Sequence, residues 1–379
     1  MNHYFRIACL STSRADAGIY RPLLFALDAD PRFNASFIAS HPCSLTDLPG
    51  VNAVNTPINQ FGDFPVAVAR ATGSAVGKFA EALMQINPDL VFVLGDRTEM
   101  LAAALGATIC SLPIAHLHGG DTTRGAYDDA CRHAISKLAH VHFPALSEHG
   151  RVLQAIGEPF DRIHVVGALA LEELARFQAE PIEACSAEVG LDLNSPTLLV
   201  VFHPETISEL PVSSQVESLV RAIAATDMQV LWIDPNADVG HGEIIRALSS
   251  LAESRRGFVR LKSVSQDRFW NCLVHCRALV GNSSAGIIEA ASLKRAVVNI
   301  GCRQEGRVRA RNVIDVGFNA DEIAEAIQRA TSEEFRTSLD GLVNPYGDGL
   351  AAERILTVLA KLPDRMTLLR KPPPGTITA

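Results

Sequence analysis

Residues 90–117 read LVFVLGDRTEMLAAALGATICSLPIAHL, and this stretch decides the fold class. Two short apolar runs, Leu90–Leu94 and Ile114–Leu117, flank a longer helical pattern at Arg97–Cys110. Runs that are apolar on both faces are typical of buried strands, as in a parallel sheet covered by helices. The order strand, helix, strand therefore predicts an α/β fold built on a doubly wound parallel sheet.

The same alternation continues on both sides of this unit and predicts two domains. In the first half the further expected elements are strands at Arg6–Ser11, His140–Phe143 and Ile163–Val166 and helices at Ile19–Leu27, Pro65–Ile86 and Asp129–Leu138. After a more polar stretch, residues 178–195, the expected strands are Thr197–Phe202, Gln229–Ile233, Phe258–Leu261, Ala278–Val280 and Ala296–Ile300. The helices expected between them are Gln215–Ala225, Gly242–Leu251, Asp267–Cys276 and Gly286–Ser292. We place Rossmann-like domains at residues 1–172 and 173–362, followed by a proline-rich tail at 363–379.

The composition is that of an ordinary globular protein. The chain has 379 residues, of which 47% are hydrophobic and 20% charged, and 34 basic and 42 acidic side chains give a net charge of −8. This acidic balance disfavours a nucleic-acid or anionic-membrane surface, which needs clustered Lys and Arg. No apolar stretch is long enough to span a bilayer. We therefore expect neither a nucleic acid nor a membrane as a partner.

The eight cysteines include no C-x-x-C pair. Because the N-terminal apolar run is too short for a signal peptide, we expect reduced thiols in a cytoplasmic protein. Cys272, His275 and Cys276 could share a helix face and bind a metal, but no second ligand cluster follows at a matching spacing. We therefore predict no metal site.

Polar residues gather in the loops after the predicted strands, where doubly wound domains bind their ligands. In the first such loop Arg14 could hold a phosphate, although a helix cap with a surface Arg–Asp pair explains this loop better on its own. After Leu90–Leu94, Asp96 and Arg97 occupy a position suited to catalysis. A capping box formed by Asp96 and Glu99 explains them equally well.

The densest polar segment is His116–His133, which holds three acids, three histidines and two arginines. Carboxylates in different environments can serve as general base and general acid, and the candidates here are Asp121, Asp128 and Asp129. The two glycines before Asp121 permit close approach of the backbone to a ligand. A hydrophilic surface loop is the alternative, and the His and Gly residues directly after an apolar strand disfavour it.

The second half offers groups that suit an anion. His203 follows a predicted strand, and a role as the capping residue of the next helix would also explain a histidine at this position. Ser283 and Ser284 join a strand to a helix and could present hydroxyls and backbone N–H groups to a phosphate, or merely cap the turn. Glu289 could accept hydrogen bonds from ribose hydroxyls, or be a solvated acid on a helix face.

Arg303 and Arg307, after Ala296–Ile300, are candidate partners of a diphosphate, with exposed charge as the alternative. Together the motifs place anion-binding features in the second half and an acid/base cluster in the first. This arrangement predicts a nucleotide diphosphate, linked to a reactive group, that is held across a cleft between the domains.

Several of these segments also occur in an order that resembles a known family. The blocks are SRAD (13–16), GDR (95–97), HGG (118–120), GAYDDACRHAISKL (125–138), HP (203–204), GNSS (281–284), RQEGR (303–307) and NPYGDG (344–349). Over nearly its whole length the chain resembles the hydrolysing UDP-N-acetylglucosamine 2-epimerase family. The RHAISK and GNSS blocks are fairly specific, and the common order of all blocks is more so.

The resemblance implies a fold like that of glycosyltransferase-B enzymes, with the active site between two Rossmann-like domains. A last helix, residues 349–362, would cross back to the first domain. In the implied reaction UDP leaves by elimination across C1–C2 of the sugar, and water adds to the resulting 2-acetamidoglucal to give N-acetylmannosamine. The resemblance implies no metal or redox cofactor, a UDP-sugar as substrate, and a homodimer or homotetramer.

The resemblance also implies roles for individual residues. Binding of the UDP-sugar is implied for Arg14, Arg97, His118, His203, Ser283, Ser284, Glu289 and Arg307. Acid/base roles are implied for Asp96, Asp121, Asp128 and Asp129, without deciding which carboxylate removes the proton from C2.

Two residues depart from the pattern of the family. Asp121 stands where the family usually has Glu, and a displacement of roughly 1 Å can cost on the order of 10²-fold in rate if nothing corrects it. Glu205 stands where an apolar residue is more usual, and we expect its carboxylate to face solvent. Both departures favour, as an alternative substrate, a UDP-2,4-diacetamido-2,4,6-trideoxyhexose of the legionaminic-acid type.

Three other functions stay open. A non-hydrolysing 2-epimerase would return UDP to C1, and the RHAISK and HP blocks favour the hydrolysing branch over it. A glycosyltransferase of the same architecture would need an acceptor groove, for which an aromatic content of 6% is low. A non-catalytic nucleotide-sugar binding module is disfavoured because three carboxylates in a cleft weaken the binding of an anion.

Overall fold

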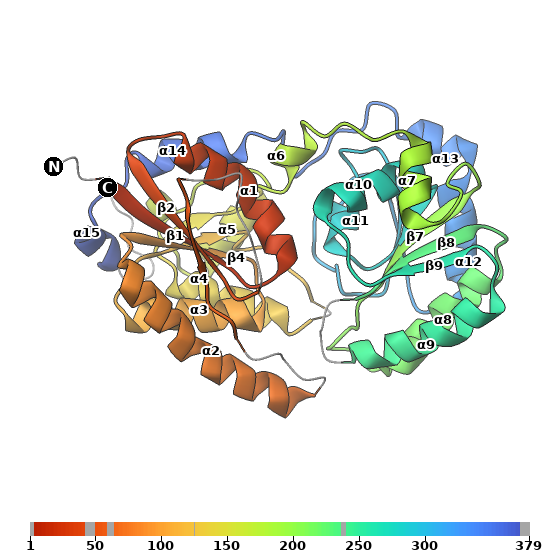
Figure 1. Cartoon of the computed structure of the whole chain (residues 1–379), viewed down its shortest axis with the longest axis horizontal. Coiled ribbons are helices and arrows are strands. Elements are labelled where there is room, and N and C mark those ends of the chain that lie inside the picture. Colours follow the sequence, from red (N-terminus) through yellow and green to blue (C-terminus); the bar gives the residue numbers. More distant parts are fainter. Residues whose placement is uncertain (1–3, 42–49, 59–63, 125, 236–239, 372–379) are drawn as a thin grey trace.

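The computed structural model describes residues 4–41, 50–58, 64–124, 126–235 and 240–371. Within them the chain forms two lobes that lie side by side (Figure 1). Each lobe contains a six-stranded sheet, with strand orders β3-β2-β1-β4-β5-β6 and β12-β11-β10-β7-β8-β9. All strand pairs are parallel. The predicted α/β fold with two doubly wound sheets is confirmed.

The first lobe is covered by helices on both sides of its sheet. Its strands are β1 (Phe5–Ser11), β2 (Phe33–Ala39), β3 (Asn52–Asn55), β4 (Leu90–Leu94), β5 (Ile114–Leu117) and β6 (Val141–Phe143). Its helices are α1 (Arg14–Asp28), α2 (Pro65–Ile86), α3 (Thr98–Ile109), α4 (Asp128–Leu138) and α5 (Ser147–Ala155). Helices α2, α3 and α4 pack against one another on the side of the sheet opposite α1 (Figure 1).

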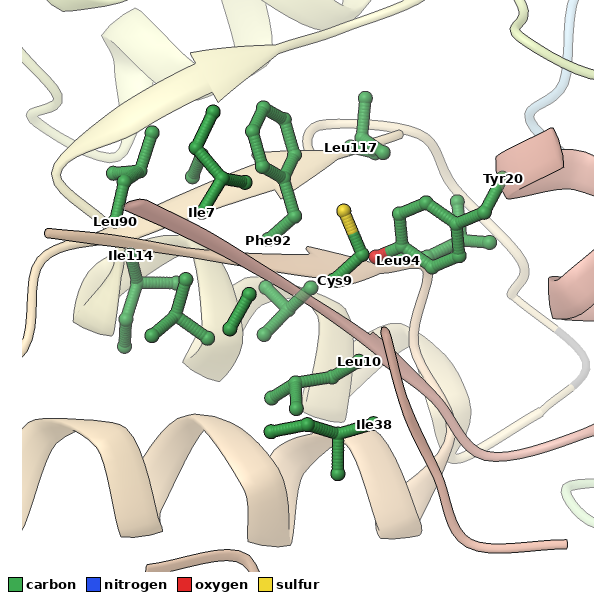
Figure 2. Packing of buried hydrophobic residues seen from close by; sticks show 14 of the residues in the cluster. Ile7, Cys9, Leu10, Tyr20, Ile38, Leu90, Phe92, Leu94, Ile114 and Leu117 are labelled. Carbon is green, nitrogen blue, oxygen red and sulfur yellow. The ribbon is translucent and has the colours of Figure 1, made fainter. Parts of the chain in front are cut away.

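The strand side chains explain why these runs are apolar on both faces. Phe92 and Leu117 lie on one face of the sheet and Leu10 and Ile38 on the other (Figure 2). All four are buried, and Tyr20 of α1 closes over the sheet beside them. Because both faces are removed from water, each apolar side chain contributes to stability wherever it falls in the strand.

The second lobe repeats the plan. Its strands are β7 (Thr197–Val201), β8 (Gln229–Ile233), β9 (Phe258–Leu261), β10 (Ala278–Gly281), β11 (Ala296–Ile300) and β12 (Val313–Val316). Its helices are α7 (Ile182–Val189), α8 (Val212–Ala224), α9 (His241–Ser254), α10 (Gln266–His275), α11 (Ser284–Ile288), α12 (Ala320–Thr331) and α13 (Glu333–Ser338). Helix α8 packs between α9 and α12, and α7 and α10 pack together elsewhere on the lobe.

The chain passes between the lobes at two adjacent places. The first contains α6 (Leu171–Leu174), and the second precedes α14 (Ala351–Leu359) and α15 (Arg365–Leu369). The two passages are joined where the Ala168 N–H donates to the Tyr346 carbonyl at 2.8 Å. Although α14 follows the second lobe in sequence, it packs on α1 in the first (Figure 1). Its buried face, including Ile355 and Leu359, belongs to the core of the first lobe.

Most expected elements are present, but the strand predicted at Ile163–Val166 is wrong. Ile163 forms only an isolated bridge with His142. The His164 and Val166 N–H groups donate to the carbonyls of His142 and Pro144, so the segment runs beside β6 without forming a strand, and Val166 is buried in the core. Strands β2, β3 and β12 were not predicted. In β2 the polar residues Asn34 and Ser36 interrupt the apolar run, which hid the strand from a search for continuous apolar segments.

Candidate active site

The predicted polar loops follow strands at which the strand order reverses. In the first sheet β1 and β4 are neighbours, and in the second β7 and β10 are neighbours. The crevice outside the carboxyl ends of such strands is the usual ligand site of doubly wound folds. Asp96 follows β4, His203 follows β7, and Ser283 follows β10. These residues therefore lie at the carboxyl edges of the two sheets, where the ligand is expected.

A buried arginine, Arg132 of α4, joins the acidic residues of the first lobe. Its Nη2 donates to the Asp96 carboxylate and to Thr123 Oγ1 (3.1 Å), and its Nη1 donates to Asp129 Oδ1 (3.2 Å). Asp96 is therefore held by an ion pair and does not cap α3, for which the cap position is Arg97. A planar guanidinium with several donors suits such a junction, because it can bind two carboxylates at once.

Asp121 links the two lobes. Its side chain is 2% exposed, and Oδ2 lies 2.8 Å from Arg307 Nη2 while Oδ1 lies 3.3 Å from His149 Nε2. Arg307 belongs to the second lobe and also donates from Nε to the Thr122 carbonyl at 3.3 Å. Two residues that the sequence placed in opposite halves are thus in direct contact.

The neighbouring acids Asp128 and Asp129 have different surroundings. Asp129 accepts a hydrogen bond from the Thr123 N–H (2.7 Å), and His133 Nε2 lies 3.5 Å from its Oδ2. Asp128, at the first residue of α4, lines the space between the lobes. Asp129 therefore supports the loop before α4, whereas Asp128 faces the space between the lobes.

Two histidines of this segment have lowered pKa values, and of the two His116 is buried while His118 is half-buried. Burial lowers the pKa of His116 to about 3 and the pKa of His118 to about 4. The ring of His116 bonds the Gly95 carbonyl (2.8 Å) and the Ser136 hydroxyl (3.0 Å), so it fixes the loop after β4 against α4. His118 adopts a left-handed backbone with φ of 62°, directly before the glycine pair.

Two glycines allow backbone segments of the protein to meet closely. A Cβ on Gly120 (φ 79°) would lie 2.2 Å from the His149 carbonyl oxygen. A Cβ on Gly281 (φ 135°) would lie 2.0 Å from the Val201 carbonyl oxygen. The close approach expected for Gly120 is therefore to α5 of the protein itself and not to a ligand.

In the second lobe, neutral hydrogen bonds hold the loops together. The His203 N–H donates to Asn282 Oδ1 (2.7 Å) and Asn282 Nδ2 donates back to the His203 carbonyl (2.9 Å). Gln304 Nε2 donates to the Asn282 carbonyl at 2.8 Å. Ser283 caps α11, as the alternative interpretation of this turn expected, and Ser284 lines the space between the lobes.

Two acids of the second lobe lie in places that the sequence did not indicate. Glu205 is 3% exposed, so the expectation that it faces solvent is wrong. It accepts hydrogen bonds from the Arg303 N–H (2.7 Å) and from Cys302 Sγ (3.2 Å), and burial raises its pKa. Glu289 accepts from Trp270 Nε1 (2.7 Å), and burial raises its pKa to about 7, so it is not a solvated helix-face acid.

A cavity of about 70 Å³ lies between the lobes. Its lining comes from both of them and consists of Asp96, Thr123, Ala126, Asp128, Ser284, Arg303, Gln304 and Arg307. Further contacts hold the lobes together beside it, since the Tyr127 N–H donates to Thr206 Oγ1 (3.2 Å) and Arg124 pairs with Glu305 (3.4 Å). Carboxylates of the first lobe and hydroxyl and guanidinium groups of the second thus share one crevice.

Other predicted residues are placed outside this lining. Arg97 pairs with Glu99 at 3.2 Å. Helix α1 begins at Arg14, but the side chain of Arg14 lies outside the part of the chain that the structure describes. Conversely, Arg132 and Gln304 lie in the quoted sequence blocks but received no role, because nothing in a sequence shows which polar residue of a block is buried.

The described residues contain no group of three or more His, Cys, Asp or Glu side chains placed to hold a metal ion. His275, part of the suggested metal cluster, bonds the Glu180 carbonyl at 2.8 Å instead. Within the same ranges, no helix has the length and apolar character that a membrane crossing requires.

Comparison with known proteins shows to which family the chain is related. The family model for UDP-N-acetylglucosamine 2-epimerase matches residues 30–360. The chain is 33% identical to the UDP-N,N'-diacetylbacillosamine 2-epimerase (hydrolyzing) of Legionella pneumophila, over 97% of this chain and 98% of that protein. It is 28% identical to the GDP/UDP-N,N'-diacetylbacillosamine 2-epimerase (hydrolyzing) of Campylobacter jejuni, over 83% of this chain and 82% of that protein.

A solved structure shows the same fold. The UDP-GlcNAc 2-epimerase of Neisseria meningitidis, bound to UDP-GlcNAc, superposes with a TM-score of 0.79 at 20% identity, covering 94% of this chain and 100% of that one. The family match extends over most of the chain, and the Legionella relative is similar along nearly the full length. This chain therefore belongs to the UDP-N-acetylglucosamine 2-epimerase family.

Proposed function

We propose that this protein is a hydrolysing 2-epimerase whose substrate is a UDP-2,4-diacetamido-2,4,6-trideoxyhexose of the N,N'-diacetylbacillosamine type. The observation that carries the proposal is the 33% identity to the Legionella enzyme over 97% of the chain. The Campylobacter relative, named for the same sugar, supports it. UDP-N-acetylglucosamine, the first substrate expected from the sequence, becomes the second candidate.

The first step is removal of the proton at C2 of the sugar. Asp96 and Asp128 line the cavity, and Asp96 is at the same time paired with Arg132. Asp121 and Asp129, which are paired with Arg307 and Arg132, do not belong to the lining. Carboxylates that line the crevice are placed to exchange protons with the ring, so we assign the acid/base work to Asp96 and Asp128. Asp121 and Asp129 then act as positioning residues, which also explains why the shorter Asp is accepted at position 121.

The second lobe meets the departing nucleotide. As the C2–H bond breaks, its electron pair forms the C1–C2 double bond and the C1–O bond breaks to release UDP. Negative charge grows on the diphosphate, and donors aimed at that charge lower the barrier. Ser284, Arg303 and Arg307 line the cavity on that side. Water then adds, with its oxygen to C1 and a proton to the opposite face of C2, giving the free sugar with inverted C2.

The cleft must open for this substrate to enter. Pockets that bind small molecules usually measure about 300–1,000 Å³, and the cavity here is about 70 Å³. The ion pair between Asp121 and Arg307 and the Arg124–Glu305 contact join the lobes directly. We infer that substrate binding separates these contacts and transfers Arg307 from Asp121 to the diphosphate.

Proton NMR in deuterated water tests the proposal. The protein is incubated separately with UDP-N,N'-diacetylbacillosamine and with UDP-N-acetylglucosamine. We expect free UDP and a free sugar that carries deuterium at an inverted C2, with a higher kcat/KM for the diacetamido substrate. A UDP-linked epimer as the sole product would refute hydrolysis, and a higher kcat/KM for UDP-N-acetylglucosamine would refute the substrate.

A further inference from the structure

Three arginines gather at the amino edge of the second sheet. Arg277 directly precedes β10, Arg295 directly precedes β11, and Arg336 lies in α13. They line one cavity of about 260 Å³. This cavity is larger than the one between the lobes, and the proposed reaction does not use it.

The cavity is separate from the active-site cleft. Ser283 and Ser284 follow the carboxyl end of β10, whereas Arg277 precedes its amino end. The strand has four residues, so its two ends are about 13 Å apart. Ligands of doubly wound folds normally bind at the carboxyl edge, so a basic cavity at the amino edge is not explained by the reaction.

The positive charge in this cavity is not balanced by the protein. Within the described ranges, the side chains of Arg277 and Arg295 have no hydrogen-bond or ion-pair partner, and the buried Nε of Arg295 is unsatisfied. Arg336 has one ion pair, at 3.6 Å, with Glu333, whose side chain is 87% exposed. No residue of the lining is acidic. Like charges held together without counter-charges are unfavourable, so the site is suited to an anion from outside.

The rest of the lining indicates what kind of anion fits. Ile182, Leu193 and Val274 give the cavity an apolar side, and Asn194 adds an amide. Guanidinium groups match the oxygens of a phosphate, and a group with two negative charges balances several arginines better than a single carboxylate does. The apolar side can contact the carbon part of the same molecule.

We propose that this cavity is a second binding site, specific for the phosphate or diphosphate group of a small phosphorylated molecule. Arg277, Arg295 and Arg336 bind the phosphate oxygens, and the ligand supplies the acceptor that the buried Nε of Arg295 lacks. The proposal concerns residues outside the cleft and does not depend on which sugar the enzyme converts.

Calorimetric titration with inorganic pyrophosphate tests the site in the full chain, with saturating UDP present to occupy the cleft. The variant Arg277→Gln/Arg336→Gln is expected to bind pyrophosphate at least about a hundredfold more weakly, since each lost charge-assisted hydrogen bond is worth about tenfold. The control Arg256→Gln/Lys262→Gln removes the same charge from two exposed side chains and is expected to bind like wild type. Pyrophosphate bound in the cleft would survive the substitutions and would not be mistaken for this site.

A second measurement uses the unmodified protein, so it does not depend on folding of a variant. Arginine labelling with phenylglyoxal, read by mass spectrometry, is expected to show that pyrophosphate protects Arg277, Arg295 and Arg336 while Arg256 stays reactive. Absence of protection, equal weakening in the control variant, or unchanged affinity in the arginine variant would each overturn the proposal.

Discussion

Acidic side chains are handled differently in the two lobes. In the first lobe the carboxylates of Asp96, Asp121 and Asp129 are paired with guanidinium groups. In the second lobe Glu205 accepts hydrogen bonds from a backbone N–H and a thiol, Glu289 accepts one from an indole, and burial raises the pKa of both. Near the cleft, the first lobe therefore stabilises charged carboxylates by ion pairing, whereas these two acids of the second lobe are bound by uncharged donors.

This difference suits what each side of the cleft does in the proposed reaction. Removal of the C2 proton needs an ionised carboxylate in a fixed position, and a buried arginine favours both the charge and the geometry. The side that binds the nucleotide must avoid negative charge near a diphosphate. Its acids can serve as hydrogen-bond acceptors of the scaffold, because burial reduces their charge.

Removing a carboxylate that lines the cavity tests the first half of the comparison, with the largest expected effect. Asp96→Asn and Asp128→Asn are each expected to lower kcat by about 10²–10⁴-fold, because an amide cannot exchange the proton. The dissociation constant of UDP, measured by calorimetry, should stay the same. Asp161→Asn, at an exposed acid of the same lobe, serves as the control and should keep wild-type kcat. Near-normal turnover in both cleft variants would contradict the assignment.

Breaking the arginine junction tests whether charge pairing holds the first lobe together. Arg132→Met leaves Asp96 and Asp129 without their partner, and we expect a loss of about 3 kcal/mol in the free energy of unfolding, measured with urea. Both carboxylates are about one quarter exposed, at 23% and 27%, which keeps the loss at the lower end of the usual range. Arg151→Met, at an arginine that is 71% exposed, should change stability by less than about 0.5 kcal/mol. Equal losses in the two variants would argue against a junction.

Substitutions of Glu205 test how the second lobe holds its acids, and we expect a smaller loss of stability than for Arg132→Met. Glu205→Leu removes the carboxylate that accepts from the part-buried N–H of Arg303, which should cost about 1 kcal/mol of stability and raise the KM for the UDP-sugar. Glu205→Gln keeps an acceptor oxygen without the charge and should restore most of both properties. If Gln were as damaging as Leu, the carboxylate would be needed in its charged form and the comparison would fail.

The fold could be predicted largely because both sheets are buried on both faces. Short runs with at most one polar residue identified β4, β5, β8, β9 and β11 with their observed bounds. The strand β2 was missed because two polar residues, Asn34 and Ser36, interrupt its run. Ile163–Val166 was predicted wrongly because an apolar run can lie beside a strand with a single bridge and form no strand of its own. The pattern of apolar residues in a sequence indicates which side chains are buried. Whether a segment pairs with a strand depends in addition on the segments that lie beside it in the fold.

The candidate site could be predicted in part for a similar reason. Loops after strands at the switch points converge by topology, so Asp96, Asp128, Ser284 and Arg307 meet in one cavity. The residues that hold this site together could not be predicted, because Arg132 and Glu205 look like ordinary surface charges in the sequence. Only the packing around them shows that Arg132 joins two acids and that Glu205 supports a loop.

The pH dependence of stability provides the finest test of the comparison, through Glu289. The pKa of this carboxyl is about 7 in the folded protein, above the usual value of 4.5. The folded state therefore holds the proton more tightly, and the stability that Glu289 contributes below about pH 4.5 is lost as the pH rises through 7. Relative to Glu289→Gln, wild type should lose about 1 kcal/mol between pH 6 and pH 7.5 in urea unfolding. Glu217→Gln, at an exposed acid of α8, should show no such difference, and a flat difference for Glu289→Gln as well would mean that burial does not favour the protonated acid in this lobe.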